Sequence, residues 1–331
     1  MNPELTPNTQ ATLLLTAPLI VGRRAEPAGL LAPREYNQLA RVLQENEKEP
    51  ADLLEPGDWF AAVAEPFGRD RLEALLGRGF LLSQAIERWR AATLWVISRA
   101  DAVYPGRIRS LLKTQAPPVF YGCGDSALLE KGGLAVVGSR HVDDALREYT
   151  INIGALAADA GRPLISGAAR GIDQSAMTGA LQAGGESVGV MADSLERAAL
   201  APAHREPLHD GNLVLMSPYD PAAGFNVGHA MQRNKMIYAL ADAGLVVNSD
   251  HAKGGTWAGA IEQLEKFRFG PLFVRDTGGE NKGCAALIRQ GGIPWPEPSS
   301  ATELEAAIES ADAASVRYPE QETLPLFVHE K

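Results

Sequence analysis

The second half of the chain alternates short apolar runs with longer stretches of helical periodicity. Short apolar runs bounded by glycine or polar residues are typical of buried strands, and the longer stretches are typical of helices that pack on a sheet. This alternation predicts a doubly wound α/β fold with a mostly parallel sheet. We predict strands at Leu134–Val137, Leu164–Ile165, Val188–Met191, Leu213–Met216, Leu245–Val247 and Leu272–Val274, and helices at 144–160, 172–183, 229–240, 256–266, 285–290 and 303–308.

The first half of the chain is dominated by helical periodicity. Tyr36, Leu39 and Leu43 share one helical face after Pro33, a residue favoured at helix starts, and leucines at 72–76 form a second stripe. These stripes indicate the core of a small helical domain without chemistry of its own. We therefore divide the chain into a helical domain (1–98), a connector with an edge strand (99–132), a sheet domain (133–298), and a C-terminal helix and tail (299–331).

Composition favours a soluble cytoplasmic protein with no membrane association. The chain has 331 residues, of which 45% are hydrophobic, and a net charge of −10. This charge argues against nonspecific binding of nucleic acid over a broad surface of the protein but is compatible with a local basic groove. Cys123 and Cys284 are too few for a disulfide framework or a cysteine-based zinc site. The apolar segment 12–21 is too short to span a bilayer, and no basic residue precedes it as in a secretory signal.

Three predicted strands run into loops that combine glycine, hydroxyl and cationic side chains. Glycine lets the backbone approach a ligand, while hydroxyl groups, guanidinium groups and helix N-termini bind phosphate. Because parallel strands end at one edge of a sheet, we expect the loops to form one phosphate-binding pocket. The alternative for each cation is a solvated charge on a tight turn. The loops are Gly138-Ser139-Arg140, Ser166-Gly167-Ala168-Ala169-Arg170-Gly171 and Lys253-Gly254-Gly255-Thr256.

Three ordered sequence blocks carry a family resemblance. The blocks are Val137–Arg140, Ser166–Asp173 and Arg233–Ile237, and with them the chain resembles the DNA-processing protein A (DprA/Smf) family between about Tyr104 and Ile293. The resemblance implies an extended Rossmann-like fold of the SLOG superfamily and an N-terminal domain similar to sterile-alpha-motif folds. It also implies single-stranded DNA binding and protection, loading of a RecA-type recombinase in DNA processing and transformation, a homodimer, and no cofactor.

The loops and the resemblance together define one candidate site for DNA or phosphate. Arg233 and Lys235 would add cations to it, and Tyr219, Phe225 and Trp257 lie near enough in the predicted topology to stack on bases or to belong to the core. The site consists of Gly138, Ser139, Arg140, Ser166, Gly167, Ala168, Arg170, Gly171, Arg233, Asn234, Lys235, Gly254, Gly255 and Thr256.

We expect no catalytic residue and no metal ligand. No G-x-G-x-x-G follows Val137, no G-x-x-x-x-G-K-[ST] is present, and the six histidines never form H-E-x-x-H. We expect no G-x-S-x-G nucleophile elbow, so for Ser166 a role in a turn or at a phosphate is favoured over that of a nucleophile.

Two questions stay open at this point. The chain departs from the family's usual pattern, for example with Met177 where a histidine is common. The sequence therefore does not decide whether the pathway is transformation or a role in mobile elements or phage defence. The alternative function is that of a nucleotide-binding or nucleotide-hydrolysing relative in the same superfamily. Gly254–Thr256 resembles the glycine loop of those relatives, but the next acid, Glu262, lies almost two helical turns farther on.

Overall fold

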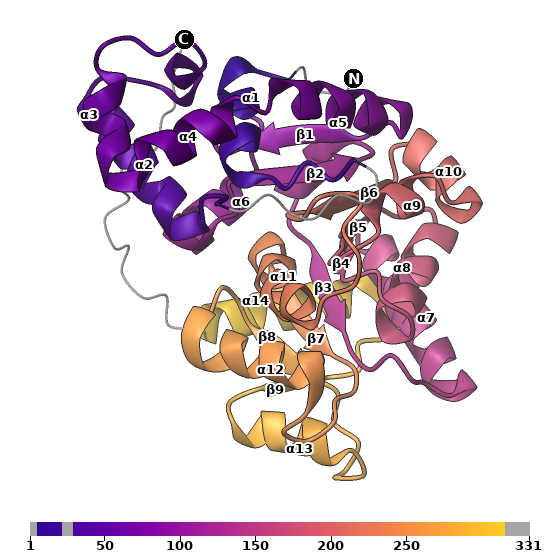
Figure 1. The fold of residues 1–331 in the computed structure, drawn as a ribbon. Helices are drawn as coiled ribbons and strands as arrows, with labels where there is room; N and C mark the ends of the chain where they lie inside the picture. The colour runs from indigo at the N-terminus through magenta and orange to yellow at the C-terminus, as the bar shows by residue number, and fades with distance from the viewer. Residues whose placement is uncertain (1–4, 22–28, 315–331) are drawn as a thin grey trace.

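A nine-stranded sheet runs through the centre of the computed structural model, which describes residues 5–21 and 29–314 (Figure 1). The strands lie in the order β1-β2-β6-β5-β4-β3-β7-β8-β9, and all pairs from β6 to β9 are parallel. The predicted doubly wound α/β fold is therefore confirmed. The strands are Trp95–Ser98 (β1), Val119–Cys123 (β2), Leu134–Val137 (β3), Leu164–Ser166 (β4), Ser187–Val190 (β5), Leu213–Ser217 (β6), Ala243–Val246 (β7), Leu272–Val274 (β8) and Ile293–Pro294 (β9).

Helices cover both faces of this sheet. Apolar residues of α1, α5, α7, α8, α9 and α14 form one core with the first face, and those of α6, α11, α12 and α13 form another with the second face. The helices are Pro7–Thr16 (α1), Pro33–Glu45 (α2), Phe60–Ala64 (α3), Arg69–Leu76 (α4), Gly79–Ala91 (α5), Gly106–Leu112 (α6), Asp144–Asp159 (α7), Ile172–Gln182 (α8), Leu195–Ala199 (α9), Pro202–His209 (α10), Val227–Leu240 (α11), Gly254–Glu262 (α12), Lys282–Arg289 (α13) and Ala301–Ala314 (α14).

Burial on both faces explains why the strands are apolar at most positions. In β3, Leu134 and Val136 face one core, whereas Ala135 and Val137 face the other. Successive side chains of a strand point to opposite faces, so a strand covered on both sides needs apolar residues throughout. The short unbroken apolar runs of the sequence are the direct result.

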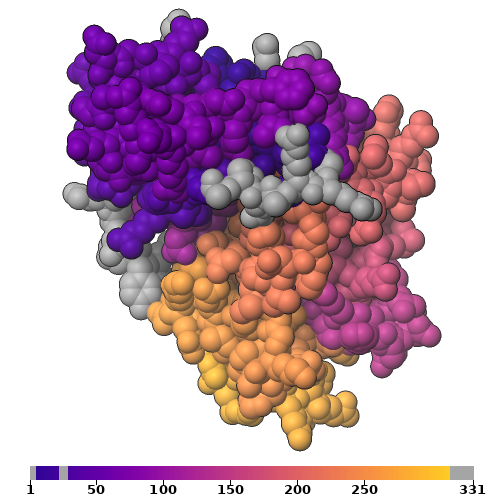
Figure 2. Space-filling model, in the orientation of Figure 1, coloured from indigo at the N-terminus to yellow at the C-terminus, as the bar shows by residue number. Residues whose placement is uncertain are grey.

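The N-terminal helices form a third, smaller core, and Figure 2 shows the N-terminal part of the chain, in indigo and purple, along the top of the molecule. Tyr36, Leu39 and Leu43 of α2 are buried there together with Leu72 of α4, as their helical spacing predicts. Not all of the N-terminal region is separate, however. Trp89 of α5 packs in the core of the sheet, so α5 belongs to the layer that covers the first face.

Two sequence predictions at this boundary are wrong. The helical stretch ends before Trp95–Ser98, because this apolar run forms β1 and pairs antiparallel with β2. The edge strand predicted within the connector 99–132 is β2, but it lies between β1 and β6 rather than at the edge of the sheet. The missed strand β1 takes the edge position. The connector also contains a helix, α6, before Pro117-Pro118.

The C-terminal end of the described chain is the predicted closing helix. Leu304 and Ile308 of α14 are buried against the first face of the sheet. The predicted tail from residue 316 lies outside the described residues. Within residues 5–21 and 29–314, none of the helices has the length and hydrophobicity that crossing a bilayer requires.

Candidate nucleic-acid interface

The loops after β3, β4 and β7 are joined at the carboxyl edge of the sheet. The amide of Ile172 donates to the carbonyl of Ser139 at 3.1 Å. Gly171 has a φ of +87°, and a Cβ there would collide with that same carbonyl, so glycine is required at this position. From the third loop, the hydroxyl of Thr256 donates to the carbonyl of Gly138 at 2.9 Å. The predicted loops thus form one connected site.

A buried carboxylate holds two of these loops together. Asp173, in the first turn of α8, is 6% exposed, and the amides of Ala169, Gly138 and Gly167 hydrogen-bond to it. Burial raises the pKa of Asp173, while the charge of Arg233 and these three amides act in the opposite direction. The amides predicted to face a phosphate are therefore engaged within the protein. This role was not predicted, although an acid in the first turn after a glycine loop is a usable signal.

Arg233 lies beneath the β4 loop and not on the surface. Its side chain is 5% exposed, and Nη1 donates to the carbonyl of Val190 at 2.5 Å. Burial lowers the pKa of Arg233, and the charge of Asp173 opposes this effect. Arginine keeps its proton in proteins, so Arg233 is a buried cation directly behind the loop. Its position does not favour the direct contact with a ligand that the sequence predicts.

Three further residues of the predicted site direct their polar atoms to the protein itself. Ser166 is fully buried, and its hydroxyl donates to a carbonyl of β3 at 2.6 Å. The side-chain amide of Asn234 donates to the carbonyl of Gly255 at 3.0 Å, which ties α11 to the start of α12. Lys235 donates to the side-chain oxygen of Gln232 at 3.1 Å, and burial lowers its pKa. Ser166 and Asn234 therefore shape the loops.

Ser139 and Ala168 also determine loop conformation. The amide of Ser139 donates to the side-chain oxygen of Asn248 at 2.8 Å, and its hydroxyl oxygen accepts from the amide of His141 at 3.3 Å. Ala168 has a φ of +52°, the left-handed region that residues with a Cβ rarely adopt. The β4 loop is thus held in an unusual conformation next to Gly171.

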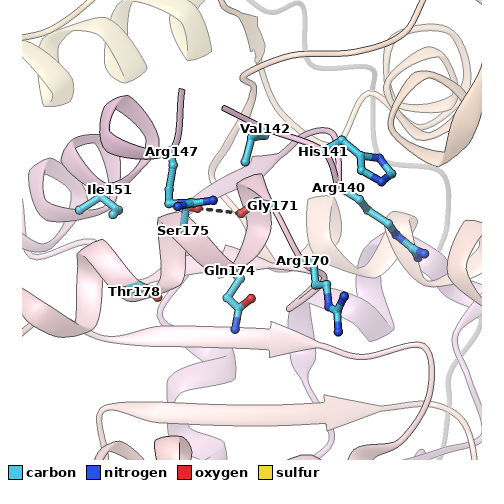
Figure 3. Close-up of a pocket in the computed structure, with 10 residues that line it drawn as sticks. All are labelled: Arg140, His141, Val142, Arg147, Ile151, Arg170, Gly171, Gln174, Ser175 and Thr178. Atoms are coloured by element: carbon cyan, nitrogen blue, oxygen red, sulfur yellow. Dashed lines mark hydrogen bonds between the residues drawn. The ribbon is translucent and has the colours of Figure 1, made fainter. Parts of the chain in front are cut away.

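Two exposed arginines lie on the surface of the site. Arg140 and Arg170 extend from neighbouring loops at the same side of a cavity (Figure 3). The guanidinium carbon of Arg140 lies 5.1 Å from the ring centre of Phe225, whose side chain is 55% exposed. Gly254 and Gly255 are exposed at the start of α12. The structure therefore brings guanidinium groups, an aromatic ring and a helix N-terminus to one edge.

The other two candidate aromatic residues are less open than Phe225. Tyr219 stacks on His229 with a centroid distance of 3.7 Å, and burial raises the pKa of Tyr219 to about 12. Trp257 is partly buried in the second core and meets His251 edge to face at 5.1 Å. Of the three, Phe225 presents the most accessible ring.

A G-x-S-x-G pattern does occur at 185–189, but it is not a nucleophile elbow. Ser187 begins β5, is fully buried, and donates to the carbonyl of Leu164 at 3.1 Å. Such an elbow requires a serine on the turn that leads from a strand into a helix. Among the described residues, no group of three or more His, Cys, Asp and Glu side chains is placed to hold a metal ion.

Comparison with protein families gives a match over most of the sheet region. The model of the family described as DNA recombination-mediator protein A matches residues 95–303. The DNA processing protein DprA of Bacillus subtilis is 26% identical over 219 residues, which are 63% of this chain and 71% of that protein. A putative DNA processing protein DprA of Mycobacterium tuberculosis is 28% identical over 235 residues, 67% of this chain and 57% of that protein. Protein Smf of Synechocystis is 25% identical over 289 residues, 81% of this chain and 69% of that protein.

Two solved structures share the fold. DNA processing protein A of Streptococcus pneumoniae aligns with a TM-score of 0.68 at 18% identity and covers 92% of this chain and 99% of its own. DNA processing protein A of Helicobacter pylori aligns with a TM-score of 0.51 at 22% identity, over 66% of this chain and 96% of its own. The Helicobacter pylori protein has a single-stranded DNA binding mode.

Proposed function

This chain belongs to the DNA recombination-mediator protein A family, and we propose that it binds single-stranded DNA as a non-catalytic protein of DNA processing. The relative from Helicobacter pylori supports this proposal, since its structure concerns single-stranded DNA binding. The strand would cross the carboxyl edge of the sheet at the loops after β3 and β4.

The observation that carries the proposal is the exposure of Arg140 and Arg170 on two loops. Asp173 and Arg233, which are buried beneath these loops, stabilise their conformation. Exposed guanidinium groups form charge-assisted hydrogen bonds with phosphates, and such phosphate contacts carry no base-sequence information. Because the chain has a net charge of −10, we expect the strand to be confined to this local cluster of cations.

The remaining members of the site would contribute less directly. Exposed Gly254 and Gly255 would present α12 amides to a phosphate, and Lys235 would add charge at the side of α11. Gly138, Gly167, Ser166 and Asn234 would fix the loop geometry on which the arginines depend.

The biological setting is proposed from the family resemblance. We propose that the protein acts in the cytoplasm as a homodimer, protects single strands, and assists their transfer to a RecA-type recombinase. The family membership supports this setting in transformation, and a role in mobile-element or phage defence is the alternative.

A fluorescence anisotropy titration tests the proposal with oligo-dT, the corresponding duplex and a mononucleotide. We expect a dissociation constant for the single strand of about 1 µM or lower at low salt, and weaker binding as salt rises. The double substitution Arg140→Ala and Arg170→Ala should weaken binding at least about tenfold and reduce the salt slope by about 0.7 for each lost phosphate contact. Arg205→Ala, an exposed arginine on α10, is the matched control. Unchanged affinity of the double variant would contradict the proposal.

Nucleotide hydrolysis is the second candidate, and the exposed glycines at the start of α12 favour it. However, the hydroxyl of Thr256 donates to the carbonyl of Gly138 and is not available to a nucleotide. Glu262 lies at the far end of α12, where it accepts from Lys266 at 3.2 Å. Incubation with AMP should therefore release no adenine. Adenine release that Glu262→Gln abolishes would favour the enzyme instead.

A further inference from the structure

A cavity of about 520 Å³ lies between the N-terminal halves of α7 and α8, beside the loops after β3 and β4 at which we propose that DNA binds (Figure 3). Arg140 and Arg170 stand at one end of it, and the cavity continues past them along Ile151 of α7 and Thr178 of α8. Cavities of this size are typical of sites for small ligands. The loops at the carboxyl edge account for only part of its lining.

Close contact between the two helices determines where this cavity lies. A Cβ at Gly154 of α7 would collide with the carbonyl of Ala176, and one at Gly179 of α8 would collide with the carbonyl of Ile151. The glycines therefore let the two helix backbones touch. The residues that line the cavity lie mostly N-terminal to this contact.

The lining carries positive charge without a carboxylate. Arg147 lines the cavity between the end where Arg140 and Arg170 stand and the end formed by Ile151 and Thr178, and none of the lining residues is Asp or Glu. Arg147 contacts Asp144 at 2.9 Å, but the side chain of Asp144 is 95% exposed. Ion pairs of this exposed kind are weak, so a bound anion can compete for the guanidinium group.

The remaining lining combines apolar and hydrogen-bonding groups. Val142 and Ile151 are half-buried apolar side chains, and Gln174 and Thr178 offer an amide and a hydroxyl. A nucleotide needs these same elements, since its base requires an apolar surface with polar edges and its phosphate requires cations.

We propose that this cavity binds one nucleotide, with its phosphate at Arg147 and its base against Val142 and Ile151. The nucleotide has two sources with the same chemistry. A DNA strand with a 5′-phosphate would place its 5′-terminal nucleotide here. This first source rests on the proposed function. A free nucleoside monophosphate would bind here independently of any strand.

The test uses the full chain with two ligands. Calorimetry measures dTMP binding, and anisotropy compares 3′-labelled oligo-dT that carries either a 5′-phosphate or a 5′-hydroxyl. Arg147→Gln removes the cation that is farthest from the strand loops, Thr178→Phe fills the cavity, and Arg205→Gln on α10 is the control. Thermal melting checks that each variant is folded.

We expect Arg147→Gln and Thr178→Phe to weaken binding of dTMP, or of the strand with a 5′-phosphate, by about tenfold. Binding of the strand with a 5′-hydroxyl should stay within about twofold of the parent chain. An effect on the strand end identifies the first source, and an effect on dTMP identifies the second. The cavity proposal is overturned if Arg147→Gln changes neither, or weakens all strands equally. If the parent chain binds dTMP but no DNA strand, and the cavity variants lose dTMP binding, the proposed function is refuted but the cavity site is not.

Discussion

The guanidinium group of Arg233 fills the space that any side chain at Gly167 would need. A Cβ at position 167 would collide with Nη1 and with the guanidinium carbon, while Nη1 is held by the carbonyl of Val190. Two blocks far apart in the sequence therefore meet in one packing contact. The shape of the β4 loop depends on a buried cation from α11.

This contact predicts that Gly167→Ala destabilises the protein. The added methyl group has no room beside a buried guanidinium, and overpacking of this kind costs about 1–3 kcal/mol of unfolding free energy. We expect urea denaturation to show that loss, and single-stranded DNA binding to weaken because the loop moves. Gly79→Ala is the control, since nothing lies within 4 Å of a Cβ there. Equal stability of Gly167→Ala and the parent chain would refute the packing argument.

Arg233 and Arg140 are predicted to have separable effects. Arg233→Met leaves Asp173 buried without the cation that acts on it and leaves the carbonyl of Val190 without its donor, and an unsatisfied buried polar group costs about 1–3 kcal/mol. Arg140→Met changes an exposed side chain, so we expect normal stability and weaker DNA binding. Denaturation and anisotropy on both variants check this. A stable Arg233→Met variant that no longer binds DNA would instead place Arg233 at the strand.

Phe225 is predicted to stack on a base. Its ring is exposed and has a guanidinium group 5.1 Å from its centre, an arrangement that suits a base next to a phosphate. Stacking on an aromatic residue contributes about 1–3 kcal/mol per base, so Phe225→Ala should weaken oligo-dT binding by about five- to 150-fold. The matched control is Phe80→Ala, because Phe80 is 75% exposed on α5. Equal effects of both substitutions would argue against a specific stacking contact.

The ion pair that anchors α14 is predicted to give an acid-dependent contribution to stability. Arg162 donates to Glu305 at 2.6 Å and to Asp242 at 2.8 Å. Hydrogen bonding and charge from Arg162 lower the pKa of Glu305 from its usual 4.5, against a smaller opposing effect of burial. A carboxyl group whose pKa is lower in the folded state stabilises that state above its unfolded pKa, and this stabilisation is lost as pH falls through the folded pKa.

Glu305→Gln should therefore lower stability at neutral pH by about 0.5–1 kcal/mol and have little effect below the folded pKa of Glu305. Urea denaturation between pH 3 and pH 7 measures both. Glu309→Gln on the same helix is the control, since its side chain is exposed. A loss of stability that stays constant over this pH range would mean that the pair does not act through its charge.

Much of the fold follows from the sequence because apolar patterning acts locally. The strands predicted at Leu134–Val137 and Leu272–Val274 agree with β3 and β8 residue for residue, and the others agree within a few residues at their ends. A strand buried on both faces must be apolar, so its sequence identifies it without knowledge of its neighbours. Trp95–Ser98 escaped prediction because a single short apolar run next to helices does not reveal which strand it pairs with.

The sequence by itself also determined which loops share the edge, because the order of strands and helices in a parallel sheet places their carboxyl ends together. Only the tertiary structure decided what each polar group in those loops does. Ser166, Thr256 and Arg233 have side chains that could bind phosphate, yet each directs them to a backbone carbonyl of another segment. A buried polar group takes the partner that packing brings within reach, and that partner lies far away in the sequence.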